Sequence, residues 1–232
     1  MTTALSKTDA VPSDTASSRP VSETRILLEG ISWETYERLL LETGESRNQL
    51  FAYRDGILEI MVPLESHEEP TRLFDQFLAA IVDELGLELR SLGSLTMKNP
   101  QQKKGLEPDC CFYIEHEAAV RGVEILNFDI HPPPDLVVEV DNSRSSLSKF
   151  SIYTALKIPE IWRLHFGKLT IYRLNTQPLE YEETDQSLAF PQLPVRELPE
   201  FMERAKVIGQ RAAVRELAQR VREILSDLEL GK

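Results

Sequence analysis

The acidic residues that could do chemistry gather in the apolar run PPDLVVEVD, residues 133–141. Side chains alternate between the two faces of a strand, so Asp135, Glu139 and Asp141 share one face. Glu139 has apolar neighbours on both sides in the sequence, which favours a central strand. A buried carboxylate without a partner either destabilises the fold or takes up a proton. A hard divalent cation such as Mg²⁺, which prefers oxygen ligands, would join these groups.

A second acid stands in the run EPDCCFYIE, where Asp109 opens an apolar strand directly after Pro108. If this strand pairs with 135–141, Asp109 and Glu139 meet at one end of the two strands. Each acid alone could instead cap a strand end or pair with a surface Arg or Lys, and that alternative stays open. The two acids together indicate a site.

A third acid comes from the run SHEE, residues 66–69, just before an apolar helix. If Ser66 caps that helix and Glu69 reaches back to it, Glu68 is left to face the sheet. Pro70 at the first helical position would instead place the cap at Glu69. Both helix starts remain open.

Lys149 supplies a positive charge for these acids. It shares one helical stripe with Ile152, Tyr153 and Leu156, at spacings of three, four and seven residues. A Lys at the beginning of an apolar stripe points toward the sheet, where its ammonium could reach the carboxylates and orient a water. The alternative is that its aliphatic stem lies along the stripe and its charge reaches solvent.

The composition limits the possible classes of protein. The formal net charge of −12 over 232 residues argues against a protein that coats nucleic acid by bulk charge. A local basic rim and a bound cation could still make the pocket less repulsive to phosphate, with salt-sensitive binding. The candidate residues for the rim are Lys98, Lys103, Lys104, Arg144, Lys149 and Lys157.

Other chemistries and locations find little support in the sequence. It contains no phosphate-cradling GxxxxGK[ST] or GxGxxG motif and no GxSxG motif, and its four histidines are scattered without ligand-like spacing. No apolar run is long enough to span a bilayer, and the N-terminus lacks the apolar run of a secretory signal. The adjacent Cys110 and Cys111 are expected to be buried thiols in a reducing cytoplasm.

The pattern along the chain predicts an α+β fold with a mixed sheet flanked by helices. We expect a disordered tail at 1–24, a restriction-endonuclease-like domain at 25–199 and a C-terminal amphipathic helix at 200–232, periodic to about 228. Asp55-Gly56 predicts a hairpin turn. The expected helices are 32–41, 73–85 and 145–157; the expected strands are 49–54, 57–62, 87–95, 109–115, 135–141, 160–166 and 169–174; 101–105 is expected to be a loop and 175–199 irregular.

Over about residues 30–175, from before the Asp55-Gly56 hairpin onward, the sequence resembles the PD-(D/E)XK nuclease superfamily, and within it the Uma-type (Uma-two) family of putative restriction endonucleases. The runs that carry the resemblance are SHEE, EPDCCFYI, PPDLVVEV and SKFSIYTALKIPEIWRL. It implies one Mg²⁺- or Mn²⁺-dependent phosphodiesterase site. The motif positions make Asp109 and Glu139 the strand acids, Glu68 the helix acid and Lys149 the catalytic lysine.

One position departs from the superfamily pattern. The superfamily Lys normally follows the second acid by two residues, and Asp141 stands there. Asp141 either adds a metal ligand or only ends the strand. The leading hypothesis is therefore a metal-dependent DNA endonuclease that acts as a homodimer. The alternative is a catalytically inactive module on the same fold, used for nucleic-acid binding or protein assembly.

Overall fold

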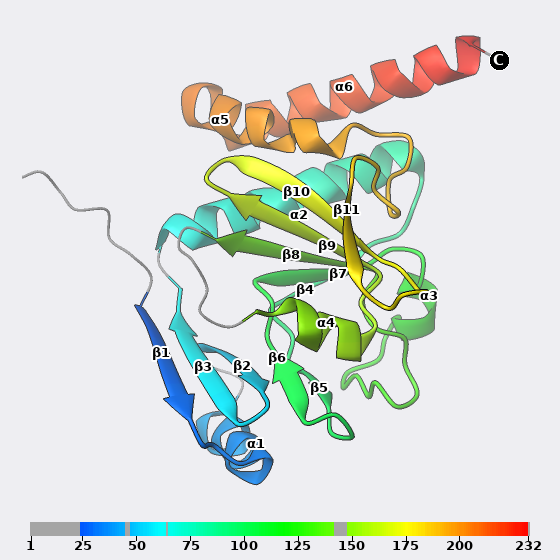
Figure 1. Ribbon diagram of the computed structural model, residues 1–232. Coiled ribbons are helices and arrows are strands. Elements are labelled where there is room, and N and C mark those ends of the chain that lie inside the picture. Colours follow the sequence, from blue (N-terminus) through cyan, green and yellow to red (C-terminus); the bar gives the residue numbers. More distant parts are fainter. Residues whose placement is uncertain (1–23, 45–46, 64, 142–147, 232) are drawn as a thin grey trace, which may run out of the picture.

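The computed structural model describes residues 24–44, 47–63, 65–141 and 148–231 (Figure 1). The expected tail therefore lies outside the described residues, apart from Thr24. In these residues two β-sheets and six α-helices form a mixed α+β architecture, and this α+β class is the one that the sequence predicts. In the described part of the chain, no helix is long and apolar enough to cross a membrane.

The smaller sheet has the strand order β1-β3-β2-β6-β5, and its neighbouring strands are antiparallel. The predicted hairpin joins β2 to β3 through Asp55-Gly56, where Gly56 takes a φ of 83° that suits glycine. Helix α1 packs Trp33 and Tyr36 against this sheet, and Ser32 caps the start of the helix. The bounds are β1 Thr24–Glu29, α1 Trp33–Thr43, β2 Leu50–Arg54, β3 Ile57–Val62, β5 Met97–Asn99 and β6 Lys104–Leu106.

The larger sheet has the order β11-β10-β9-β8-β7-β4 and is mixed, because β8 and β9 are parallel while the other pairs are antiparallel. Its strands are β4 Arg90–Gly93, β7 Cys110–Tyr113, β8 Leu136–Asp141, β9 Glu160–His165, β10 Lys168–Leu174 and β11 Tyr181–Thr184. The remaining helices are α2 Glu65–Leu85, α3 Glu117–Val120, α4 Phe150–Leu156, the 3-10 helix η1 Val195–Glu197, α5 Leu198–Ile208 and α6 Gln210–Leu230.

Strand β8 lies inside the larger sheet and is buried along its whole length. Leu136, Val138 and Val140 face the main core, which α2, α5 and α6 complete on one side of the sheet. Val137 faces the opposite side, where it packs with α4. The alternation of faces expected along this strand is therefore confirmed, and it turns Glu139 toward α4.

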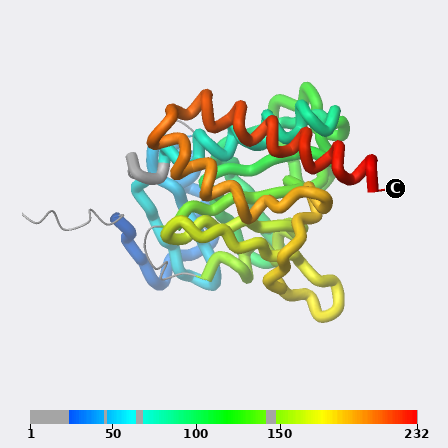
Figure 2. The backbone as a smooth tube through the Cα atoms, turned by 90° about the horizontal axis from the view of Figure 1, so that it is seen from above, coloured from blue at the N-terminus to red at the C-terminus, as the bar shows by residue number. Residues whose placement is uncertain are grey.

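The prediction of a single C-terminal helix is wrong. The segment forms two helices, α5 and α6, which fold back on each other and lie side by side over the molecule (Figure 2). Gly209 separates them with a φ of 88°, a conformation that residues with a side chain rarely adopt. The apolar stripe of α6 is buried in the main core through Ala213, Leu217 and Val221. It therefore covers its own chain.

Several boundaries also differ from the sequence-based expectations. The expected loop at 101–105 includes the start of β6, and the expected irregular segment 175–199 contains β11 and η1. The strand expected at 87–95 is reduced to β4. These strands are three or four residues long, too short for a periodic pattern to mark them.

Two helix starts differ as well. Helix α2 begins at Glu65, before both expected starts, and it contains Pro70 in its interior. Helix α4 begins at Phe150, and the earlier expected residues 145–147 lie outside the described part. The strands expected at 160–166 and 169–174 are present as the antiparallel pair β9 and β10.

Candidate functional site

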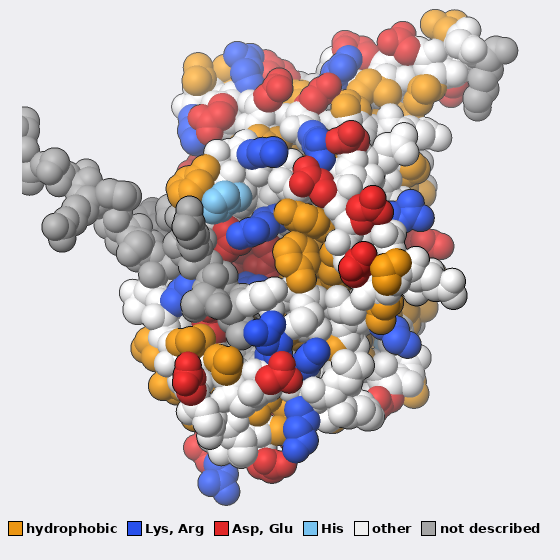
Figure 3. All heavy atoms as spheres, in the orientation of Figure 1, with side chains coloured by type: hydrophobic (Ala, Val, Ile, Leu, Met, Phe, Trp, Pro, Cys, Tyr) orange, Lys and Arg blue, Asp and Glu red, His pale blue; other side chains and the backbone are white. Residues whose placement is uncertain are grey.

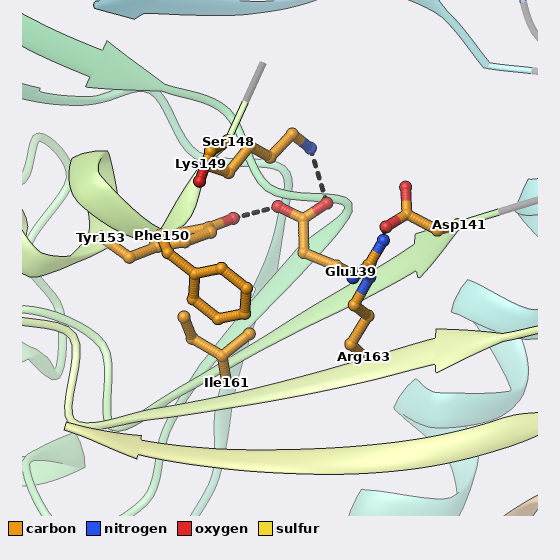
Figure 4. A pocket seen from close by; sticks show the side chains of 8 residues that line it. All are labelled: Glu139, Asp141, Ser148, Lys149, Phe150, Tyr153, Ile161 and Arg163. Atoms are coloured by element: carbon orange, nitrogen blue, oxygen red, sulfur yellow. Dashed lines mark hydrogen bonds and ion pairs between the residues drawn. The ribbon is translucent and has the colours of Figure 1, made fainter. Parts of the chain in front are cut away.

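Glu139 is a carboxylate held inside the larger sheet. It is 4% exposed and faces α4. Its Oε2 accepts a hydrogen bond from Lys149 Nζ at 2.6 Å, and its Oε1 accepts one from the Tyr153 hydroxyl (Figure 4). The structure thus brings together two of the sequence-predicted site residues, Glu139 and Lys149. The stripe of α4 had included Tyr153 only as a packing residue, so its polar role was missed.

Helix α4 explains how Lys149 reaches the strand. Lys149 immediately precedes the first helical residue, Phe150. Ile152 and Tyr153 are buried against the sheet and turn this side of the short helix toward β8. The Lys149 side chain is consequently only 13% exposed. The start of α4 and the middle of β8 therefore fix a buried ion pair.

Burial governs the electrostatics of this pair. Desolvation raises the pKa of Glu139 to about 7, against the opposing effect of the Lys149 ammonium and with help from the carboxylates of Asp109 and Asp141. Burial alone would lower the pKa of Lys149, but the Glu139 and Asp109 carboxylates outweigh it and leave that pKa raised. Burial and the neighbouring Glu139 also raise the pKa of the Tyr153 hydroxyl, which stays protonated as a donor. The Glu139 carboxylate is thus held between a cation, Lys149, and the carboxylates of Asp109 and Asp141.

Asp109 lies directly before β7, next to the strand that carries Glu139. Its Oδ2 accepts a hydrogen bond from the backbone N–H of Val140 at 2.6 Å. In the β7–β8 ladder Cys110 stands opposite Val138, so Asp109 continues the ladder toward Glu139. The Asp109 carboxylate helps to raise the pKa of both Glu139 and Lys149.

Glu68 occupies a different part of the surface. It and Asp109 line a polar cavity of about 410 Å³ beside α2, whereas Glu139 and Lys149 line another of about 220 Å³ beside α4. The Glu68 carboxylate is exposed and lies 3.9 Å from Arg72 Nε, one turn further along α2. The structure therefore brings Glu68 to the same cavity as Asp109 but not to the cavity of Glu139.

Asp141 is engaged by two arginines. Its Oδ1 accepts a hydrogen bond from Arg25 Nη2 at 3.3 Å, and its Oδ2 accepts one from Arg163 Nε at 2.7 Å. Arg25 comes from β1 and Arg163 from β9, so residues distant in the chain compensate this buried charge. Both carboxylate oxygens of Asp141 point to arginines. This arrangement favours a role for Asp141 in ending the strand rather than in binding a metal ion.

The sequence matches the family model described as "Uma2: Putative restriction endonuclease" over residues 33–202. The chain belongs to the Uma2 family. This confirms the resemblance seen in its motifs and indicates a nuclease. The match begins in α1 and ends within α5, so it includes every residue proposed for the site.

One solved structure similar to this Uma2 chain is the crystal structure of a putative nuclease belonging to DUF820 from Anabaena variabilis ATCC 29413. The two chains share 15% sequence identity, and their structures match with a TM-score of 0.44. The match covers 79% of this chain and 99% of that chain. No match was found among curated proteins.

Asp109 and Glu139 are the two acids of this Uma2 chain that are candidates for holding a divalent cation. Within the described residues, no three Asp, Glu, His or Cys side chains are grouped so that they could hold a metal ion. Mg²⁺ needs fewer protein ligands, because it keeps several waters and is commonly bound by one or two carboxylates together with substrate phosphates. Asp109, directly before β7, and Glu139 in β8 are two such carboxylates, and they line different cavities. Their mutual repulsion is the observation that supports the fit.

The expected basic rim is only partly built from the expected residues. Figure 3 shows Lys and Arg side chains beside a recess that holds acidic side chains. Lys104 Nζ donates to the backbone oxygen of Ser151 in α4 at 3.4 Å, near the site. Lys98 instead pairs with Glu37 at 3.1 Å, and Arg144 lies outside the described residues. Arg163 belongs to this rim and was missed from the sequence.

Proposed function

We propose that this protein is a metal-dependent endonuclease that hydrolyses DNA phosphodiester bonds. The observation that carries the proposal is the buried Glu139–Lys149 pair, which sits beside Asp109 at the end of two paired strands. Membership in a family of putative restriction endonucleases supports the nuclease reaction. The choice of DNA as substrate and of Mg²⁺ or Mn²⁺ as cofactor belongs to the proposal.

The proposal gives each residue a role. Asp109 and Glu139 would hold Mg²⁺, which supplies a bound water of lowered pKa and positive charge opposite the phosphate. Lys149 would orient the attacking water and stabilise the charge that develops on the phosphate oxygens. Tyr153 holds one oxygen of Glu139 and thereby fixes the direction of the other. Glu68 would act through water, from the cavity that it shares with Asp109.

A plasmid assay tests the proposal. Supercoiled DNA is incubated with the unchanged protein and with Glu139→Ala, each with Mg²⁺, with Mn²⁺ or with EDTA. Glu124→Ala, which removes an exposed carboxylate in the loop after α3, is the matched control. We expect metal-dependent nicking by the unchanged protein and by Glu124→Ala, and its loss in Glu139→Ala. Equal nicking by all three proteins would identify a contaminating nuclease and contradict the proposal.

The second candidate function is a non-catalytic module that binds nucleic acid or another protein. The observation in its favour is that two arginines neutralise Asp141 at the position where the superfamily carries its Lys. Calorimetric titration with Mn²⁺ separates the two functions. Binding that disappears in Asp109→Ala supports the endonuclease, whereas absence of binding by the unchanged protein supports the module.

We also propose that the protein acts as a cytoplasmic homodimer. The support is general, because an enzyme that cuts both DNA strands gains from two-fold symmetry. Both cysteines are free and buried, as expected in a reducing compartment. Since the apolar stripe of α6 covers its own chain, the dimer would need another surface. Light scattering of the full chain tests the dimer, and a monomeric mass at all concentrations would contradict it.

A further inference from the structure

Arg163 faces the same cavity as the candidate catalytic pair. In the parallel ladder of β8 and β9 it stands opposite Glu139, so the two side chains leave the sheet on the same face. Arg163 lines the cavity of about 220 Å³ together with Glu139, Lys149 and Asp141 (Figure 4). Its side chain is 33% exposed, whereas that of Glu139 is almost fully buried. Arg163 therefore stands where the cavity meets solvent.

Within the described residues, Arg163 uses only part of its hydrogen-bonding capacity. A guanidinium carries five N–H donors in a planar fork. Arg163 uses Nε for Asp141, and its two terminal amino groups donate to no residue in the described parts of the chain. Lys149, by contrast, donates to Glu139. Arg163 is thus a cation in the cavity with donors left for an anion.

A buried chain of charges fixes the orientation of Arg163. Asp141 holds its Nε, and the other oxygen of Asp141 is bound by Arg25 from β1. Arg25 Nη1 is in turn bound to Glu59 of β3 at 2.8 Å. The side chains of Glu59, Arg25 and Asp141 are each at most 10% exposed. An arginine held by Nε keeps its terminal edge for bidentate contact with a phosphate.

We propose that Arg163 binds a backbone phosphate of DNA and that Asp141 is the positioning residue that aims it. This inference rests on the proposed function, because it takes nucleic acid as the substrate. It names the phosphate contact of the site and gives Asp141 a role other than metal binding. An acidic residue would then promote binding of an anion, which is the opposite of what its charge alone predicts.

Anisotropy of a fluorescein-labelled DNA duplex tests the inference. Binding is measured with Ca²⁺ in place of Mg²⁺, over a series of salt concentrations, with gels to verify that the duplex stays intact. Arg163→Gln should weaken binding roughly tenfold and lower the slope of log K against log salt by about 0.9, as expected for one lost phosphate contact. Arg173→Gln, which removes an exposed charge from β10, should change the slope little.

Substitutions of Asp141 show whether this carboxylate strengthens or weakens DNA binding. Asp141→Ala removes a negative charge, so bulk electrostatics predicts tighter binding of DNA. If Asp141 aims Arg163, Asp141→Ala weakens binding instead, and Asp141→Asn, which keeps an acceptor for Nε, restores most of it. The double variant Asp141→Ala/Arg163→Gln should bind no more weakly than Arg163→Gln alone. Circular dichroism verifies that each variant is folded.

The outcomes separate this inference from the proposed function. If the unchanged protein binds the duplex and Arg163→Gln keeps its affinity and slope, the inference is overturned while the proposed function stands. Tighter binding by Asp141→Ala overturns the positioning role. Absence of duplex binding by the unchanged protein overturns both the inference and the proposed DNA substrate.

Discussion

Replacing Lys149 with Met should destabilise the metal-free protein in a way that depends on pH. The substitution keeps the aliphatic bulk beside β8 but leaves the Glu139 carboxylate buried without its cation. Removal of one partner from a buried ion pair typically costs 3–5 kcal/mol. We expect roughly 3 kcal/mol at pH 8, the lower end of that range, because Glu139 keeps the Tyr153 hydrogen bond and can relieve its charge by taking up a proton.

The pH dependence follows from the pKa of Glu139. Burial raises this pKa to about 7 in the folded protein, against an ordinary value of 4.5 in the unfolded chain. Because the folded pKa is the higher one, the contribution of Glu139 to stability is fully present below about pH 4.5 and is lost as pH rises through about 7. Replacing Lys149 raises the pKa of Glu139 further, so the stability contributed by Glu139 continues to fall above pH 7. Lys149→Met should therefore cost little at pH 5 and most at pH 8.

Urea unfolding at the two pH values, in EDTA, measures this difference. Lys168→Met is the matched control, because Lys168 is exposed on β10, and it should change the free energy of unfolding by less than about 0.5 kcal/mol. The double variant Glu139→Gln/Lys149→Met removes both charges and should recover most of the loss at pH 8. An equal cost at pH 5 and pH 8, or a double variant as unstable as Lys149→Met, would refute the reasoning.

Three further predictions follow from the same geometry. Since Glu139 must lose its proton to bind a cation, Mn²⁺ affinity measured by calorimetry should rise between pH 6 and pH 8, and a flat profile would contradict a role for Glu139 as ligand. Tyr153→Phe should lower the free energy of unfolding by about 1 kcal/mol, because it removes the hydroxyl that donates to buried Glu139; thermal unfolding without change would refute this. Gly209→Ala should cost about 1 kcal/mol in the same measurement because of its φ of 88°, whereas Gly231→Ala, at a φ of −83°, should be nearly neutral.

The parts of the site that follow from local pattern could be predicted. The alternation of side chains along β8 places Glu139 on the face opposite Val138, and the stripe of α4 turns Lys149 toward the same face. Each of these conclusions needs only the spacing at which side chains return to the same face of one strand or one helix. The order of β7 and β8 in the sheet then brings Asp109 beside them.

The partners of Asp141 could not be predicted. Arg25 lies 116 residues away in the sequence and Arg163 lies 22 residues away, so their meeting depends on sheet order and strand register. The register that sets Arg163 opposite Glu139 comes from the parallel pairing of β8 with β9 and leaves no periodic mark in either strand. The break at Gly209 could not be predicted either. The apolar residues keep their helical spacing from α5 into α6, so the pattern predicts one continuous helix.

The position of α6 over α2 bears on how a shorter piece of this protein would behave. The family match spans residues 33–202 and therefore omits β1 and all of α6. A fragment cut at those limits would open the apolar face of α2 to water, where Phe77 and Ile81 lie in the main core. It would also lose Arg25, one of the two arginines that contact the buried Asp141. A recombinant fragment that keeps these contacts should therefore include β1 and α6 in addition to the matched segment.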